Sequence, residues 1–165
     1  AVVAAAVAAC GRALRFAPPE LRARRDIVLL AVQHDGLALE FASRALRADR
    51  DAVLAAVVHN GRALRYAAPE LQADRELAKA ALLQSPWALR FVDRRLRADR
   101  ELVRGAVARN GWVLRFASEE LRADRELVLT AVTRTGMALR FAAQSLRADR
   151  GVALAAVAQD GRALE

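Results

Sequence analysis

The sequence predicts an all-α solenoid made of 25-residue, two-helix repeats. The first observation is a gapless internal period, because segment 36–60 aligns position by position with segment 111–135 and with four others. The second is composition: Ala and Leu supply much of the 55% hydrophobic content, whereas aromatic residues make up only 5%. Ala and Leu favour helices, and the strand-favouring aromatic residues are scarce.

The repeats account for all 165 residues as one array. Partial repeats at 1–10 and 161–165 flank six full copies, at 11–35, 36–60, 61–85, 86–110, 111–135 and 136–160. The chain thus begins inside a longer helix, with Val2, Val3 and Val7 at core positions, and stops inside a shorter helix at Glu165. Because exposed array ends reduce solubility, we expect a segment of a longer protein, or a subunit sheltered in a larger assembly.

Each copy contains start and stop signals for a longer helix of about 11 residues. Apolar residues such as Leu127, Val128, Ala131 and Val132 then form one stripe of that helix. A glycine, often preceded by Asn or Asp, is expected to end it. The expected N-cap residues are Asp49, Asp74, Asp99, Asp124 and Asp149.

A shorter helix follows the glycine, for example over residues 62–67. Proline after this segment, as at Pro69, predicts its end, and the next residues form a one-turn connector that Ser43 or Ser118 caps in its copy. Neither helix is long enough to persist alone, so neighbouring copies must stack around a common core.

Three columns keep their character in every copy and are predicted to form that core. The first is Leu14, Leu39, Leu64, Leu89, Leu114, Leu139 and Leu164. The second is Phe16, Phe41, Tyr66, Phe91, Phe116 and Phe141. The third is Leu21, Leu46, Leu71, Leu96, Leu121 and Leu146.

The repeated string L-R-A-D-R-E-L-V-L-x-A-V-x-x-N-G-x-A-L-R-F-A, seen most fully over Leu121–Ala142, resembles the tandem repeats known as domain of unknown function 4116 (DUF4116). The resemblance covers essentially the whole chain. It implies short repeated α-helical units, found in algal, protist and some bacterial or viral proteins, and it assigns no reaction and no catalytic residue. Local departures are Pro86 for the glycine, Gln72 for an arginine and Gly151 for an acidic residue.

The net charge is +8, and Lys79 is the one lysine among 27 basic residues. This arginine bias is consistent either with recognition of phosphate or with a coding bias toward Ala and Arg. One arginine column directly follows the expected caps, and we interpret it as pairing ionically with neighbouring copies. Its members are Arg25, Arg50, Arg75, Arg100, Arg125 and Arg150.

A strip on the shorter helices is the candidate protein-binding surface. Trp, Leu, Met and Arg on an outward face are typical of interface centres. Trp87 with Arg90, and Trp112 with Arg115, lie three residues apart and are expected to stack as cation–π pairs. The strip comprises Leu37, Trp87, Trp112, Met137, Arg90, Arg115 and Arg140.

Binding of RNA or another polyanion is the alternative function. The variable positions hold Leu, Trp, Met and Arg rather than the polar residues that read bases, so such binding would be sequence-tolerant. Its candidate strip faces solvent, interrupted by Glu40 and Glu165: Arg15, Arg65, Arg90, Arg115 and Arg140.

Catalysis, cofactors and metals are not expected. The sequence contains no Gly-rich phosphate loop, nucleophile elbow or metal-ligand spacing, and His34 and His59 are one repeat apart, too distant to share an ion unaided. Cys10 is expected to be packed and inert. No apolar run approaches the ~18 residues that cross a bilayer.

The sequence therefore predicts a structural or scaffolding protein that holds a protein partner within a larger complex. An accessory subunit of an organellar assembly, such as a photosynthetic complex, would suit the distribution of the family it resembles. The compartment itself is not indicated by any targeting segment.

Overall fold

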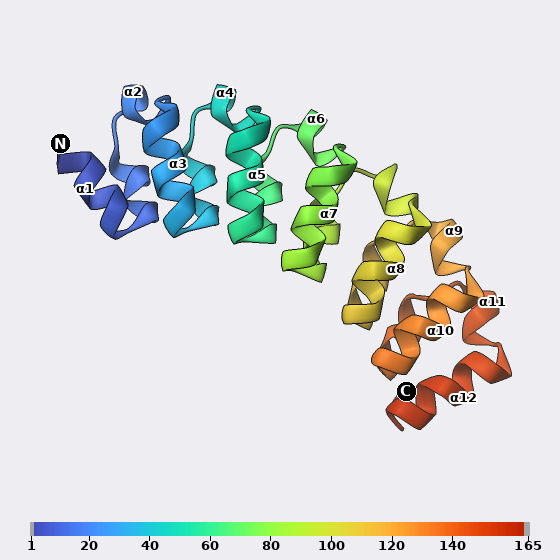
Figure 1. Cartoon of the computed structure of the whole chain (residues 1–165). Coiled ribbons are helices and arrows are strands. Elements are labelled where there is room, and N and C mark those ends of the chain that lie inside the picture. The colour runs from blue at the N-terminus through green and yellow to red at the C-terminus, as the bar shows by residue number, and fades with distance from the viewer. Residues whose placement is uncertain (1, 164–165) are drawn as a thin grey trace. The chain divides into compact units, whose positions relative to one another are not determined.

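The computed structural model describes residues 2–163, with side chains from residue 5 onward, and every regular element in that part of the chain is helical. The chain divides into two compact units, Ala1–Asp93 and Arg94–Glu165, each an α-solenoid of the same repeats (Figure 1). The predicted core residues Val2, Val3 and Leu164, and the terminal Glu165, lie outside the described side chains.

The longer helix of each copy is an α-helix that follows the predicted aspartate and ends just before the residue that precedes the glycine. Its length is ten residues in the copies after the first, close to the predicted length. These helices are α1 (Val2–Ala9), α3 (Arg25–His34), α5 (Arg50–His59), α7 (Arg75–Gln84), α8 (Arg100–Arg109), α10 (Arg125–Arg134) and α12 (Arg150–Gln159).

The aspartate caps are confirmed. Each predicted cap side chain accepts a hydrogen bond from the backbone N–H three residues further on, which satisfies one of the free donors of the first turn. The capping residues are Asp49, Asp74, Asp99, Asp124 and Asp149.

The shorter helix of each copy is a 3₁₀ helix of six residues. In the copy that begins at Gly61, Asn60 accepts a hydrogen bond at 3.0 Å from the backbone N–H of Arg62, which tightens the chain at the start of this helix. The members are η1 (Gly11–Phe16), η2 (Gly36–Phe41), η3 (Gly61–Tyr66), η4 (Pro86–Phe91), η6 (Gly111–Phe116) and η7 (Gly136–Phe141).

A single helical turn connects one copy to the next, as predicted, and Ser43 and Ser118 cap their turns. The residue before each turn also joins consecutive copies: the N–H of Ser43 donates to the carbonyl of Arg22 at 2.9 Å, and this bond recurs down the chain. The turns are α2 (Pro19–Arg22), α4 (Arg44–Arg47), α6 (Pro69–Gln72), η5 (Leu96–Ala98), α9 (Glu119–Arg122) and α11 (Gln144–Arg147).

The elements of each unit form two layers. In the first unit α1, α3, α5 and α7 lie side by side in sequence order, and η1 to η4 form the second layer (Figure 1). In the second unit α8, α10 and α12 pack in order, and η6 lies beside η7. Each 3₁₀ helix packs against the α-helix of its own copy and, within a unit, against the α-helix of the following copy.

The glycine that starts most 3₁₀ helices is required by a close approach between copies. A Cβ on Gly61 would lie 2.1 Å from the carbonyl oxygen of Ala81 in the next copy, and one on Gly36 would lie 2.3 Å from that of Ala56. No described glycine has positive φ, so these residues do not end the helix through a left-handed conformation as expected. They supply space for the neighbouring helix end instead.

The first leucine column is the core, as predicted: Leu14, Leu39, Leu64, Leu89 and Leu114 are fully buried and Leu139 is almost so. Valine, leucine and alanine of the α-helices complete it. The third leucine column is only partly buried, with Leu46 and Leu121 its most buried members. The predicted aromatic core column is wrong, because Phe16 is 81% exposed and the other five rings are half-buried.

The arginine that follows each cap links consecutive copies, as interpreted from the sequence. The Nε of Arg100 lies 2.7 Å from a carboxylate oxygen of Asp124, the cap of the next helix. Each aspartate therefore accepts from its own helix and from the preceding copy. Equivalent pairs are Arg25–Asp49, Arg50–Asp74 and Arg125–Asp149.

We predict opposite effects for alanine at two glycines. Gly61→Ala should lower the free energy of unfolding by about 1–3 kcal/mol, because the new methyl group overlaps the Ala81 carbonyl. Gly105→Ala should raise it by about 1 kcal/mol, because Gly105 lies within α8 with no atom near its missing Cβ. Urea denaturation followed by circular dichroism measures both, and equal effects of the two changes would contradict this role of the glycines.

We also predict that the caps make stability depend on acid pH. The hydrogen bond from Arg100 and that from the N–H of Leu127 hold the pKa of Asp124 below its usual value. This stabilisation is complete above the ordinary Asp pKa of about 3.9 and is lost as pH falls through the lower folded value.

The matched variants are Asp124→Asn and Asp124→Ala. Asn keeps the cap but loses the charge, so it should weaken the acid dependence more than it reduces stability at neutral pH. Ala removes both and should reduce stability by about 1–2 kcal/mol. Denaturation at several pH values separates these effects, and identical pH profiles for all three proteins would refute the assignment.

Candidate functional site: arginine and aromatic residues on the 3₁₀ helices

The last two residues of each 3₁₀ helix point away from the core. In η3 the preceding Leu64 is fully buried, Arg65 is exposed and the ring of Tyr66 is half-buried. We call the two columns that these positions form the arginine–aromatic ladder. In the first unit it comprises Arg15, Phe16, Glu40, Phe41, Arg65, Tyr66, Arg90 and Phe91, and in the second Arg115, Phe116, Arg140 and Phe141.

In the first unit, arginine side chains lie over aromatic rings. The guanidinium carbon of Arg65 lies 4.9 Å from the ring centre of Tyr66 and 5.6 Å from that of Phe91 in the next copy. Arg90 lies over Phe91 at 5.1 Å, so one ring has two guanidinium groups beside it. Arg15 lies over Phe16 at 5.0 Å. All these distances lie within the ~6 Å range of cation–π attraction.

The second unit repeats the arrangement. Arg115 lies 5.2 Å from the ring centre of Phe116 and 5.5 Å from that of Phe141, and Arg140 lies 5.7 Å from Phe141. The step from an arginine to the ring of the next copy is 26 residues, as it is from Arg65 to Phe91. The rings therefore serve as supports for arginines from two copies.

One rung has a different chemistry. Glu40 replaces the ladder arginine of its copy, and the ring 26 residues later is tyrosine, whose hydroxyl donates a hydrogen bond to Glu40 at 2.9 Å. Tyr66 is the one tyrosine in the sequence. Thus the loss of a cation–π contact coincides with a hydroxyl that suits the carboxylate.

The ladder arginines differ from the arginines that join the caps. Arg15, Arg65, Arg115 and Arg140 are exposed and form no ion pair with any carboxylate in the described part of the chain. Most cap-joining arginines have such a partner. The ladder thus carries positive charge that the fold itself does not neutralise.

The predicted variable strip is less exposed than expected. Leu37, Trp87, Trp112 and Met137 are all half-buried. The ring of Trp112 contacts Phe141 edge-on, with centroids 5.8 Å apart and planes at 61°. Arg115 lies over Phe116 and Phe141, so the predicted stacking of Trp112 on Arg115 is wrong.

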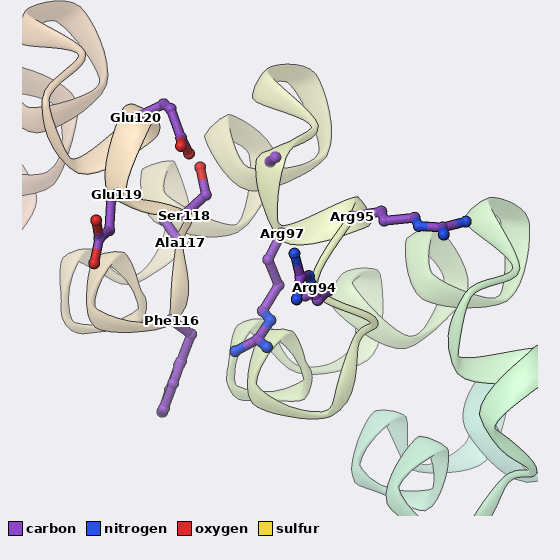
Figure 2. A pocket seen from close by; sticks show the side chains of 9 residues that line it. Arg94, Arg95, Arg97, Phe116, Ala117, Ser118, Glu119 and Glu120 are labelled. Atoms are coloured by element: carbon purple, nitrogen blue, oxygen red, sulfur yellow. The ribbon is translucent and has the colours of Figure 1, made fainter.

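An open hollow of about 470 Å³ lies beside the ladder in the second unit. Arg94 and Arg97 lie together on one side of it, and Ser118, Glu119 and Glu120 come from the other, as Figure 2 shows. The Nε of Arg97 is buried without a hydrogen-bond partner. Because two carboxylates share its lining with the arginines, the hollow is of mixed charge.

Sequence reasoning could have placed the aromatic column on the surface. Residues two apart on a helix do not share a face, so Leu64 and Tyr66 could not both enter one core. The opposite sequence error concerns Cys10, which is exposed rather than packed. His34 and His59 are exposed at the ends of α3 and α5, and no group of three His, Cys, Asp or Glu side chains within residues 2–163 could hold a metal.

Comparison with known families decides the relationship of the chain. Matches to Domain of unknown function (DUF4116) cover residues 2–47, 49–97, 74–122, 99–147 and 124–165. The chain belongs to the DUF4116 family. The successive matches step along this DUF4116 array in register with its 25-residue period. No curated protein and no solved structure matches the sequence significantly. Among residues 2–163 of the DUF4116 chain, no helix combines the length and apolarity needed to span a membrane.

We predict that Tyr66 of the DUF4116 chain titrates at a high pH. Burial, followed by the hydrogen bond to Glu40, raises the pKa of Tyr66 above its ordinary value. The hydrogen bond therefore stabilises the fold fully below the ordinary tyrosine pKa and is lost as pH rises through the folded value.

Ultraviolet absorbance of tyrosinate measures this titration directly, because the sequence has one tyrosine. Glu40→Gln should shift the Tyr66 pKa part of the way to its ordinary value, since burial remains. Glu70→Gln, which changes an exposed acid elsewhere in the same unit, is the control. A Glu40→Gln titration identical to that of the unmodified protein would show that the carboxylate does not hold the hydroxyl.

Proposed function

We propose that this chain is a non-catalytic scaffold that holds a protein partner on the face formed by its 3₁₀ helices, within a larger assembly. The single observation that carries the proposal is the arginine–aromatic ladder, whose arginines are exposed, positioned over rings and unpaired at Arg15, Arg65, Arg115 and Arg140. Side chains held in place before binding lose less conformational entropy when a partner arrives.

The composition beside the ladder supports a protein partner. Half-buried Leu37, Trp112 and Met137 adjoin the arginines, and Trp, Met and Arg are enriched at the centres of protein interfaces. The repeated 3₁₀ helices also present the same residue types at regular intervals within each unit. Such a surface suits an elongated contact rather than a single deep pocket.

Sequence-tolerant binding of a polyanion is the second candidate, and the unpaired arginines favour it as well. The two candidates differ in salt dependence, because contacts with phosphates weaken steeply as salt rises and releases fewer counterions. A contact that also buries Trp112 and Met137 should weaken less. Binding measured at two salt concentrations therefore separates them.

The test is co-purification of stoichiometric partners with the tagged chain, with and without nuclease. We predict that replacing Arg65, Arg90, Arg115 and Arg140 by alanine removes the partner. The control replaces four other exposed arginines, Arg44, Arg104, Arg147 and Arg150, and so removes the same charge away from the ladder.

A partner that survives nuclease treatment and is lost only with the ladder variant agrees with the scaffold. A partner lost equally in both variants would place the contact elsewhere. Loss of all partners on nuclease treatment would favour the polyanion function.

A further inference from the structure

We propose that the ladder binds an extended acidic polypeptide segment, whose Asp or Glu carboxylates pair with the edges of the ladder guanidinium groups. The inference rests on the proposed scaffold function and specifies the chemistry of its partner. The site is argued in the second unit, around Arg115, Arg140 and Phe141, and the same elements recur in the first unit around Arg65, Arg90 and Phe91.

Two guanidinium groups beside one ring form the centre of the site. Arg115 and Arg140 lie 5.5 and 5.7 Å from the centre of Phe141, and neither has a carboxylate partner within the described residues. Two like charges this close repel each other in the free protein. An anion placed between them or along them relieves that repulsion, which makes the pair complementary to negative charge.

The geometry of arginine over a ring favours carboxylates. Attraction to the ring holds the guanidinium plane, while its N–H groups remain able to donate at the edge. A carboxylate accepts two such parallel hydrogen bonds, which gives both strength and direction. Of the 27 basic residues only Lys79 is a lysine, and it lies on α7, outside the ladder.

Several features favour a polypeptide over single-stranded nucleic acid. Bases bind such surfaces by stacking on exposed aromatic faces, but arginines already lie over Tyr66, Phe91 and Phe141. In the first unit Glu40 occupies a rung and would repel a continuous phosphate chain. Met137 and Trp112 beside the ladder offer apolar contacts to the alternate side chains of a peptide.

The repeat spacing suggests how the acids are arranged. Packed helical elements lie roughly 8–10 Å apart, which sets the separation of equivalent positions in consecutive copies. A polyproline II segment advances about 3.1 Å per residue, so three residues cover about 9 Å. A partner with an acidic residue at every third position therefore places successive carboxylates on successive rungs within a unit.

The test uses the full chain and fluorescein-labelled peptides in an anisotropy titration. The main probe has glutamate at every third position, with proline and alanine between. One control peptide has glutamine in place of glutamate, and a second has the same number of glutamates at every second position. A uridine oligonucleotide of equal net charge is the competing class of ligand.

We expect the every-third-position peptide to bind most tightly and the glutamine peptide not to bind. Arg115→Ala with Arg140→Ala should weaken binding about tenfold or more, because each removes a charge-assisted hydrogen-bond partner. The Lys pair at these positions keeps the charge but loses the fork, so it should weaken binding severalfold. Arg104→Ala with Arg147→Ala, an equal charge loss elsewhere in the second unit, should have little effect, and circular dichroism confirms that each variant folds.

The proposal is wrong if the oligonucleotide binds more tightly than the acidic peptide, or if the Arg115 and Arg140 variant binds the peptide unchanged. It is also wrong if no acidic peptide binds while a co-purifying protein still depends on the ladder. In that last case the scaffold function stands and only the acidic chemistry fails. Failure of both experiments refutes the two proposals together.

Discussion

The close approach of each 3₁₀ helix to the α-helix of the next copy determines the arrangement of the rest of each unit. At Gly36 the backbone passes so near the carbonyl of Ala56 that no side chain fits between them. This contact sets the distance between copies, and the buried leucines and valines then fill the space behind it. Since neither helix of a repeat is long enough to be stable alone, the joint between copies is what makes the helices persist.

The same stacking step produces the other contacts between copies. An arginine pairs with an aspartate 24 residues later, as Arg100 does with Asp124, and a ladder arginine lies over a ring 26 residues later, as Arg115 does over Phe141. The first contact is at one end of the α-helices and the second at the end of the 3₁₀ helices. Together they hold each copy at two separate places and so restrict rotation between neighbours.

Much of this could be predicted from the sequence because the period repeats every local rule. The aspartate caps, the buried Leu64 column and the joining role of Arg100 all follow from residue type and spacing. The surface position of Phe141 was missed because an aromatic residue in every copy suggests a core, although the two-residue spacing from Leu139 argues otherwise. The 3₁₀ form and the steric role of Gly36 depend on contact with the next copy, which no single repeat encodes.

The rung at Glu40 indicates which part of the ladder serves the fold. There the arginine is absent, and a hydrogen bond from Tyr66 takes the place of the cation–π contact between copies. A ring and a matching partner therefore suffice to join two copies, and positive charge is not needed for that purpose. At Arg115 and Arg140 the charge is nevertheless present, exposed and not neutralised by any carboxylate in the described chain. The fold uses the flat faces of these guanidinium groups and leaves their N–H edges unused, so the edges are the part of the surface on which a ligand would act.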